Sequence, residues 1–168
     1  MNYKETFAPT SIATYQSIRT LLAIVARLQL RIHQMDVKTA FINSPLTETV
    51  HIHKPEGLPV SEGTPVLRLR KALYGLKQAP RALDTMIDQN FKELKYQRCL
   101  SDYCIYVKDT AMITLYVDDI LIISDSQKEI DETKRFLKDR FKMEDMGPVK
   151  RFLGMDIDQS SEGNIRIS

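Results

Sequence analysis

The sequence predicts an α+β fold of the split-βαβ class, in which an antiparallel sheet carries helices on one face. Helical and strand-like stretches follow the order helix, strand, loops, helix, hairpin, helix, hairpin. Two strand-like runs, Met112–Tyr116 and Ile120–Ser124, are separated only by Val117-Asp118-Asp119, which indicates a hairpin rather than a parallel crossover. A chain of 168 residues is long enough for one domain with a sizeable core.

Three helices are predicted by apolar residues that recur at i, i+3, i+4 and i+7. Their expected ranges are about 11–28, 80–96 and 126–146. Thr10 or Ser11 can cap the first helix, and Pro80 suits the first turn of the second. Ser126 and Glu129 form a capping box that opens the third helix, which the pair Gly147-Pro148 ends.

Strands are predicted where polar and apolar residues alternate, or where short apolar runs lie between turn signals. The expected strands are 30–37, 50–53, 67–70, 104–108, 112–116, 120–124, 152–158 and 164–168. A short helical turn at Thr39–Ile42 follows the first of them and stops at Asn43-Ser44-Pro45. Between residues 54 and 65, three prolines and two glycines predict a loop.

Charge is distributed unevenly along the chain. The net charge of +2 is too small to indicate nucleic acid, and a charged fraction of 27% is that of an ordinary globular protein. However, Arg68–Arg81 holds five basic residues and no acidic one, whereas Asp118–Asp131 holds five acidic residues and one lysine. This polarity suits a protein that binds a phosphate backbone at one place and cations at another. Two ordinary solvated faces would give the same pattern.

The cysteine content and the length of the apolar runs argue against a disulfide-rich protein and against a membrane protein. Two cysteines, Cys99 and Cys104, make no disulfide framework, so a reducing compartment is expected. His51 and His53 would share one face of a strand, which permits metal binding but equally fits a plain strand surface. Apolar runs fall short of the ~20 residues that a membrane helix needs, and no signal peptide is recognised. We therefore expect no membrane partner and no secretion.

Two adjacent carboxylates, Asp118 and Asp119, interrupt a run that otherwise indicates a buried strand. Ionised carboxylates are costly to bury without a partner, and a divalent cation is one such partner. Asp36 ends the strand at 30–37, so it comes close to the pair if that strand lies beside the hairpin. Three carboxylates at one sheet edge suit two Mg²⁺ ions roughly 3.5–4 Å apart and metal-dependent phosphoryl transfer. A polar β-turn would also explain the pair.

Six segments of the chain, taken in order, resemble the reverse transcriptase domain in the Pol polyprotein of Ty1/copia-type retrotransposons. They are Tyr3–Pro9, His33–Phe41, Lys54–Gly57, Leu73–Arg81, Tyr116–Asp119 and Phe152–Met155. A lone Tyr-Val-Asp-Asp is weak, but six ordered motifs over nearly the whole chain are specific. The resemblance implies a polymerase palm with part of the fingers, as one domain over residues 1–168 that is truncated at both ends.

This resemblance implies a role for each carboxylate. Asp36, Asp118 and Asp119 would be the catalytic residues and would bind two Mg²⁺ ions, with Mn²⁺ as an alternative. The carbonyl of Val37 would be a further metal ligand.

It also implies a nucleotide site. Thr39 and Ala40 would offer backbone N–H groups to the incoming triphosphate. Phe41 would lie under the sugar and exclude a 2′-hydroxyl, although a plain core aromatic residue would explain it as well. Tyr74 would contact the new base pair.

Template and primer would be held by a further set of residues. They are Lys77, Gln78, Arg81, Tyr116, Phe152, Leu153, Gly154 and Met155. Lysine and arginine dominate binding to phosphate backbones, which makes the two basic residues plausible phosphate contacts. The last four would form the primer-grip hairpin under the primer's 3′ end. A helix entry whose basic residues stay in water, and an ordinary hairpin that closes the sheet, are the structural alternatives.

The chain departs from the family pattern in several places. Leu83 and Asp84 stand where an aromatic pair is usual, Asn43-Ser44 replaces Asn-Gly, and the chain has no tryptophan. The missing tryptophan removes a large buried side chain, and an aspartate there is expected to weaken helix packing. Strands of the fingers upstream, and the thumb, connection and RNase H parts downstream, are expected to be missing. Without them, primer and template would be poorly positioned.

The leading hypothesis is therefore an RNA-directed DNA polymerase domain that transfers deoxynucleotides to a primer 3′-hydroxyl. Its partners would be a primed RNA or DNA template, deoxynucleoside triphosphates and the other Pol segments. It would work in the cytoplasm, within a virus-like particle of an intact element, or in the nucleus. The alternative is an inactive retrotransposon relic with residual nucleic-acid binding. A metal-dependent phosphohydrolase ranks below both, because the chain offers no clear general base or leaving-group acid.

Overall fold

A computed structural model describes residues 12–59, 66–160 and 164–168. The helices are α1 (Tyr15–Leu28), α2 (Ala40–Asn43), α3 (Ala79–Glu93) and α4 (Gln127–Arg140). The strands are β1 (Arg31–Val37), β2 (Pro45–His53), β3 (Val66–Lys71), β4 (Gln97–Arg98), β5 (Ile105–Lys108), β6 (Ala111–Tyr116), β7 (Asp119–Ser124), β8 (Met143–Pro148), β9 (Arg151–Phe152), β10 (Met155–Gln159) and β11 (Ile165–Ile167). The predicted α+β class is confirmed.

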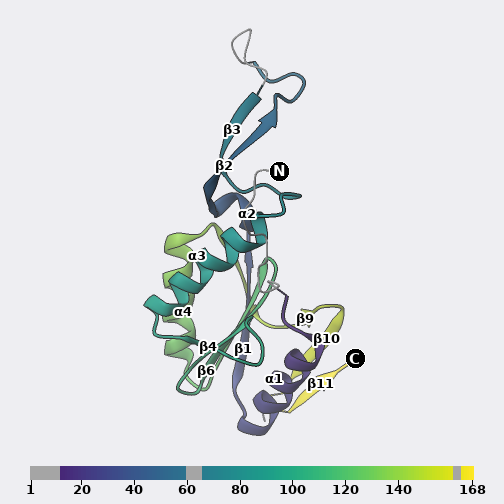
Figure 1. The fold of residues 1–168 in the computed structure, drawn as a ribbon. Helices are drawn as coiled ribbons and strands as arrows, with labels where there is room; N and C mark the ends of the chain where they lie inside the picture. The colour runs from purple at the N-terminus through teal and green to yellow at the C-terminus, as the bar shows by residue number, and fades with distance from the viewer. Residues whose placement is uncertain (1–11, 60–65, 161–163) are drawn as a thin grey trace.

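The main sheet has six strands in the order β4-β5-β6-β7-β1-β8, and neighbouring strands run antiparallel. Strand β1 therefore lies between β7 and β8, which come much later in the chain. The strand pairing that would bring Asp36 close to the hairpin turn is present, because β1 pairs with β7 along six residues. Strands β2 and β3 form a separate two-stranded arm that projects from one end of the sheet (Figure 1).

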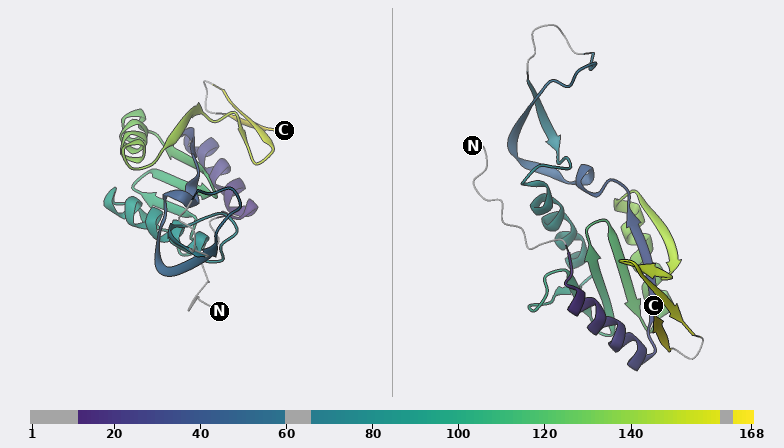
Figure 2. Two further views of the ribbon diagram at one scale, coloured as in Figure 1. Left: turned by 90° about the horizontal axis from the view of Figure 1, so that it is seen from above. Right: turned by 90° about the vertical axis from the view of Figure 1, so that its right-hand side faces the viewer.

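Helices cover both faces of the sheet, and the prediction that they cover only one face is wrong. Helices α3 and α4 lie on one face, whereas α1 lies on the other, on the side of β9–β11 (Figures 1 and 2). The five residues 120–124 of β7 are all buried, whichever face their side chains point to. A run of consecutive buried residues, apolar up to Ser124, is typical of a strand covered on both sides, as is usual for parallel sheets. This run is the feature of the sequence that indicates helices on both faces of the sheet.

The start of α1 differs from the predicted one. The helix begins at Tyr15, and the hydroxyl of Thr14 caps it by accepting from the N–H of Ser17 at 3.1 Å. Ahead of the cap, the N–H of Ala13 donates to the carbonyl of Leu115, so the chain here pairs with β6 instead of coiling. The predicted caps Thr10 and Ser11 lie outside the described residues.

Helix α4 is shorter than predicted. Half of the predicted capping box is present: the hydroxyl of Ser126 accepts from the N–H of Glu129, but the N–H of Ser126 donates to the hydroxyl of Ser124 instead of to Glu129. The helix ends at Arg140, however, and the Gly147-Pro148 pair lies inside β8. Pairing with β1 overrides the helical pattern, because the exposed edge of β1 needs hydrogen-bond partners. Glycine and proline are tolerated because β8 is an edge strand.

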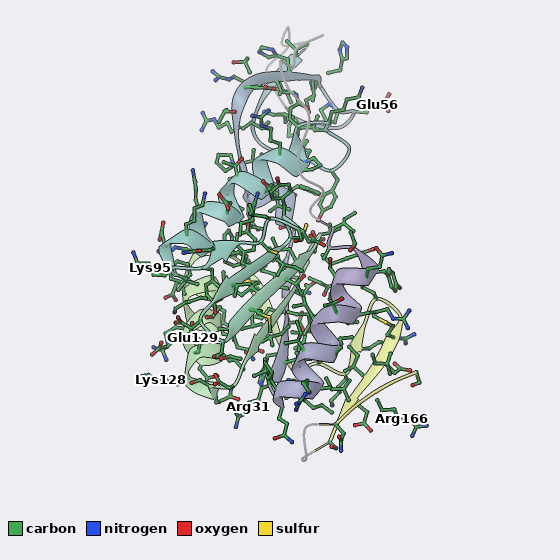
Figure 3. The ribbon with its side chains drawn as sticks, turned by 60° about the horizontal axis from the view of Figure 1, so that its bottom comes forward. Arg31, Glu56, Lys95, Lys128, Glu129 and Arg166 are labelled. Carbon is green, nitrogen blue, oxygen red and sulfur yellow. The ribbon has the colours of Figure 1, made fainter. Side chains whose placement is uncertain are left out.

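The start of α4 is fixed to the sheet by one side chain. Glu129 accepts a hydrogen bond from the hydroxyl of Tyr96 at 3.2 Å and pairs with the ammonium of Lys108 at 2.8 Å. Its neighbour Lys128 belongs to the outer surface, with a side chain 85% exposed (Figure 3). Glu129 therefore lies on the face of α4 that packs toward the sheet, whereas Lys128 lies on the solvent-exposed face.

Two further strand predictions need correction. Strand β2 begins at Pro45 rather than Val50, which lengthens the arm. The strand expected at 152–158 is broken by a tight turn at Leu153-Gly154 into β9 and β10, and β10 then pairs with β11 as the second hairpin. Both turn residues have positive φ, 52° and 80°, as in the favoured two-residue hairpin turns.

Leu83 and Asp84, which stand where the family usually has an aromatic pair, are accommodated in α3. Leu83 is fully buried in the core. Asp84 makes two hydrogen bonds to the guanidinium of Arg98, at 2.8 Å and 3.2 Å. The expected weakening of helix packing is therefore offset by an ion pair that ties α3 to β4.

We expect Asp84→Ala to lower the free energy of unfolding by about 2 kcal/mol, because it removes a bidentate bond to a largely buried charge. Asp88, 3.2 Å from the same guanidinium, keeps the loss from being larger. Urea denaturation measures the change. Glu93→Ala is the matched control, since Glu93 pairs with Arg140 in the open and should cost well under 1 kcal/mol. Equal losses in both variants would contradict the argument.

Candidate active site

Asp36 and Asp119 lie directly opposite each other on neighbouring strands. They are Cα partners in the antiparallel pairing of β1 with β7, so their side chains are on the same face of the sheet. The backbone brings Asp118 to the same place, because the N–H of Val37 donates to the carbonyl of Asp118 at 2.7 Å. The juxtaposition of three carboxylates that depended on this strand pairing is thus present at one end of the sheet.

The turn that carries Asp118 is strained. Val117 has a φ of +57°, a conformation that β-branched residues rarely adopt. The following residue, Asp118, is not among the residues with positive φ, and this combination is that of a type II′ hairpin turn. Strain of this kind costs on the order of 1–3 kcal/mol and is often found at functional sites.

Each carboxylate has a partner of its own. Asp36 pairs with the ammonium of Lys38 at 2.7 Å. Asp119 accepts from the amide of Gln34 at 2.9 Å, and Asp118 accepts from the hydroxyl of Tyr74 at 3.0 Å. Within the part of the chain that the structure describes, no three carboxylate, histidine or cysteine side chains form a ready metal-binding group.

Asp118 is the electrostatically unusual member of the group. Its second oxygen, Oδ1, is buried and has no hydrogen-bond partner. Burial raises the pKa of Asp118 above its usual value, and the nearby charges of Asp36 and Asp119 add to the rise, against the opposing effect of the hydrogen bond from Tyr74. A buried carboxylate oxygen without a partner is an open position for a donor or a cation.

The residues predicted to bind the nucleotide lie together beside Asp118. The rings of Phe41 and Tyr74 meet edge to face, with centroids 4.7 Å apart and planes at 84°. Burial and the hydrogen bond to Asp118 raise the pKa of Tyr74, and a backbone hydrogen bond from Ala40 opposes the rise. Thr39 has a left-handed backbone, with a φ of 54°, and precedes Ala40 at the start of α2. Tyr74 thus links the start of α2 to the carboxylates.

The predicted primer-grip segment also reaches this region. Phe152 is buried, and its ring meets that of Tyr116 edge to face with centroids 6.2 Å apart. Tyr116 directly precedes the strained turn. The carbonyl of Leu153 accepts from the hydroxyl of Tyr15 at 2.9 Å, which ties the β9–β10 turn to α1. Gly154 is exposed and Met155 is half-buried.

The basic segment is divided between two places. Gln78 and Arg81 line a cavity of about 420 Å³ between β2 and α3, whose lining includes none of the three carboxylates. Lys77 is exposed at the entry to α3. The cavity that Gln78 and Arg81 line is therefore not formed by the carboxylates.

Sequence reasoning missed three polar residues of the site. Gln34 lies two residues before Asp36 on β1, so strand alternation alone would have placed it on the same face. Lys38 lies just past the end of β1 at Val37, where alternation no longer applies. Glu144, the cross-strand neighbour of Asp36 on β8, had no such signal either, because the preceding helix was predicted to run to about residue 146. The ammonium of Lys38 lies 2.7 Å from the carboxylate of Glu144.

Comparison with models of known protein families shows which family the chain belongs to. The family model described as reverse transcriptase (RNA-dependent DNA polymerase) matches residues 1–168. The chain belongs to the reverse transcriptase family. The predicted resemblance to the Pol polyproteins of Ty1/copia-type retrotransposons is thereby confirmed at the level of family.

Individual reverse transcriptase relatives agree. The chain is 39% identical over 163 residues to the retrovirus-related Pol polyprotein from transposon TNT 1-94 of Nicotiana tabacum, covering 94% of this chain. It is 38% identical over 140 residues to the putative transposon Ty5-1 protein of Saccharomyces cerevisiae, covering 80% of this chain, and 35% identical over 162 residues to the Pol polyprotein from transposon RE1 of Arabidopsis thaliana, covering 93%. The chain spans 12%, 45% and 11% of the lengths of these relatives.

None of the helices in the described ranges 12–59, 66–160 and 164–168 is long and apolar enough to cross a membrane.

Proposed function

We propose that this chain is the palm, with part of the fingers, of an RNA-directed DNA polymerase from a copia-type retrotransposon. In this reaction the primer 3′-hydroxyl attacks the α-phosphate of a deoxynucleoside triphosphate and pyrophosphate leaves. The observation that carries the proposal is the direct pairing of Asp36 with Asp119 beside the Asp118 turn. Three carboxylates then share one end of the sheet, within a chain that matches the reverse transcriptase family over its full length.

The residues of the site fit divalent cations. Carboxylate oxygens are the ligands that Mg²⁺ and Mn²⁺ prefer, and Asp118 offers a buried oxygen without a partner. Asp36, Asp118 and Asp119 would hold two Mg²⁺ ions, with the carbonyl of Val37 as a further ligand. When bound, the ions would lower the pKa of the primer hydroxyl and neutralise charge on the departing pyrophosphate.

The protein's own contribution is positioning. The edge-to-face pair of Phe41 and Tyr74 supplies a rigid wall next to Asp118, against which the sugar of the incoming nucleotide would lie. The N–H groups at the start of α2 would face the triphosphate. The β9–β10 hairpin, packed on Tyr116 through Phe152, would support the primer end. Positioning of this kind supplies much of the rate of phosphoryl transfer.

A basic face on the β2–β3 arm supports contact with a phosphate backbone. His51 pairs with Arg68 across the two strands, so alternation places His51, His53, Arg68 and Arg70 on one face of the arm. These four residues are exposed. Leu67 and Leu69 lie on the opposite face and are half-buried. The template strand, together with its primer, would be the partner of the basic face.

Primer extension tests the proposal. The 168-residue chain is incubated with a labelled oligo(dT) primer on poly(rA), dTTP and Mg²⁺, and products are resolved by length. We expect a ladder that requires dTTP and disappears with EDTA. An Asp36→Asn chain, purified in parallel, measures the background from contaminating polymerases. No extension above that background would contradict the activity of this chain.

Sugar selection by Phe41 gives a sharper prediction. Phe41→Ala is expected to raise the use of UTP relative to dTTP by roughly 10- to 200-fold, because steric exclusion in a pocket is worth that much discrimination. Single-nucleotide incorporation with each substrate measures the ratio. Phe136→Ala is the matched control, because Phe136 is half-buried on α4 against Arg140 and should leave the ratio unchanged. An unchanged ratio in Phe41→Ala would mean that Phe41 is only a core aromatic residue.

The second candidate is a relic that binds nucleic acid without catalysis. It is favoured because each of the three carboxylates already has a partner within the chain, namely Lys38, Gln34 or Tyr74. Binding of a labelled primer–template at a series of salt concentrations measures the phosphate contacts. Arg68→Ala with Arg70→Ala is expected to reduce the slope of log K against log salt by about 2 if both residues contact phosphate. Binding without extension would favour the relic.

A further inference from the structure

A row of three carboxylates crosses the sheet at the candidate site. Asp36 on β1 is the Cα partner of Asp119 on β7 and also of Glu144 on β8. All three therefore lie on one face, on three adjacent strands. Like charges directly opposite each other in a sheet are destabilising, so such a row needs a cation.

In this structure a side chain of the protein supplies that cation. The ammonium of Lys38 lies 2.7 Å from Oδ2 of Asp36 and 2.7 Å from Oε2 of Glu144. A lysine ammonium is charged at neutral pH, so Lys38 brings a full positive charge between the two carboxylates. It contacts the same carboxylate that the proposed function assigns to a divalent cation.

The two partners of Lys38 differ in their surroundings. The side chain of Glu144 is 55% exposed, whereas that of Asp36 is 30% exposed. Lys38 itself is 45% exposed, so it can move toward solvent without opening the core. If Asp36 is taken by another cation, Lys38 keeps one of its two ion pairs by remaining on Glu144.

We propose that Lys38 is an internal counter-ion of Asp36 that a divalent cation displaces, and that Glu144 holds the displaced ammonium. This inference rests on the proposed function and assigns two residues that regulate metal affinity at that same site. Glu144 is then a positioning residue, which acts through Lys38. In the metal-free protein Lys38 offsets the charge of Asp36 and Glu144, and its contact with Glu144 lowers the cost of exchanging it for the metal at Asp36.

Mn²⁺ binding to the 168-residue chain, without nucleotide or nucleic acid, tests this inference through the electron paramagnetic resonance signal of free Mn²⁺. Lys38→Met is expected to tighten binding, because it removes the competitor for Asp36. Glu144→Gln is expected to weaken it, because Lys38 then has only Asp36. Exposed ion pairs of this kind are worth up to about 1 kcal/mol, which corresponds to a change of roughly 2- to 5-fold in Kd for each variant.

The double variant separates the proposed exchange from a simple effect of charge. If Glu144 acts through Lys38, Glu144→Gln should change the Kd much less in the Lys38→Met background than in wild type. Equal effects in both backgrounds, or no tightening in Lys38→Met, would overturn the inference. Circular dichroism of the four chains checks that all are folded.

The two proposals fail in different experiments. A wild-type chain that binds no Mn²⁺ in this assay overturns the displacement of Lys38. Polymerase activity is judged separately, by primer extension against the Asp36→Asn background. A chain that extends primers while its Mn²⁺ affinity is indifferent to Lys38 and Glu144 would keep the proposed function and lose the inference.

Discussion

A chain carrying Asp118→Asn is expected to lose primer extension, by at least about 10³-fold relative to wild type. Charge stabilisation by metal-bound carboxylates is worth several kcal/mol, and each 1.4 kcal/mol is tenfold in rate. Asparagine has nearly the shape of aspartate and can still accept from Tyr74, so the hairpin should stay intact. Asp139→Asn, an exposed substitution on α4, is the matched control and should extend primers as wild type does.

The same substitution should stabilise the fold at neutral pH. Burial raises the pKa of Asp118 in the folded chain, so folded Asp118 binds its proton more tightly than unfolded Asp118 does. Stability supplied by the protonated form is complete below the ordinary pKa of 3.8 and is lost as the pH rises through the higher folded value. The free energy of unfolding of Asp118→Asn should therefore increase relative to that of wild type as the pH rises.

Urea unfolding of both chains between pH 3 and pH 7 measures this difference. The two curves should meet at the acidic end, where protonated aspartate resembles asparagine, and should separate toward neutrality. A wild-type chain that is more stable than Asp118→Asn at pH 7 would contradict the assignment of Asp118 as a destabilised, functional carboxylate. Asp139→Asn should show no such separation.

Phe152→Ala should have the largest effect on stability, a loss of about 3–5 kcal/mol in the free energy of unfolding. Phe152 is 2% exposed and belongs to the core, and its ring contacts that of Tyr116. Urea denaturation gives the value.

The matched control for this variant is Leu100→Ala, which also truncates a large apolar side chain. Leu100 is 89% exposed, so its loss should cost less than about 0.5 kcal/mol. A loss below 1 kcal/mol for Phe152→Ala would mean that the β9–β10 hairpin is not anchored to the sheet.

The sequence was sufficient for the local elements whose signals are periodic. The stripe of α1, the alternation of β3 and the apolar runs of β6 and β7 correspond to elements of the structure. Where a long-range partner decides, sequence reasoning failed: residues 143–148 form a strand because β1 needs a neighbour on its second edge. The helix cap at Thr14 was missed for a similar reason, since the chain before it pairs with β6.

The candidate site could be predicted in part. The proximity of Asp36 to the Asp118-Asp119 turn followed from one assumption on strand order, which the pairing of β1 with β7 satisfies. The partners of the carboxylates depend on register and on side-chain reach, neither of which a single sequence contains. Tyr74 comes from a loop 44 residues away; the family resemblance assigned it to the new base pair, and its hydrogen bond to Asp118 was not predicted. The catalytic roles remain predictions.

The position of β1 between β7 and β8 also affects how the sheet can form while the chain is being synthesised. Both neighbours of β1 are made later, and β8 emerges roughly 100 residues after it, which at 5–20 residues per second is a delay of about 5–20 s. Until β7 emerges β1 has two unpaired edges, and until β8 emerges it has one, and such edges invite pairing with other chains. During synthesis Asp36 therefore lacks its cross-strand partners on β7 and β8 until these strands are made. We expect nascent chains of this protein to need a chaperone more than their size suggests.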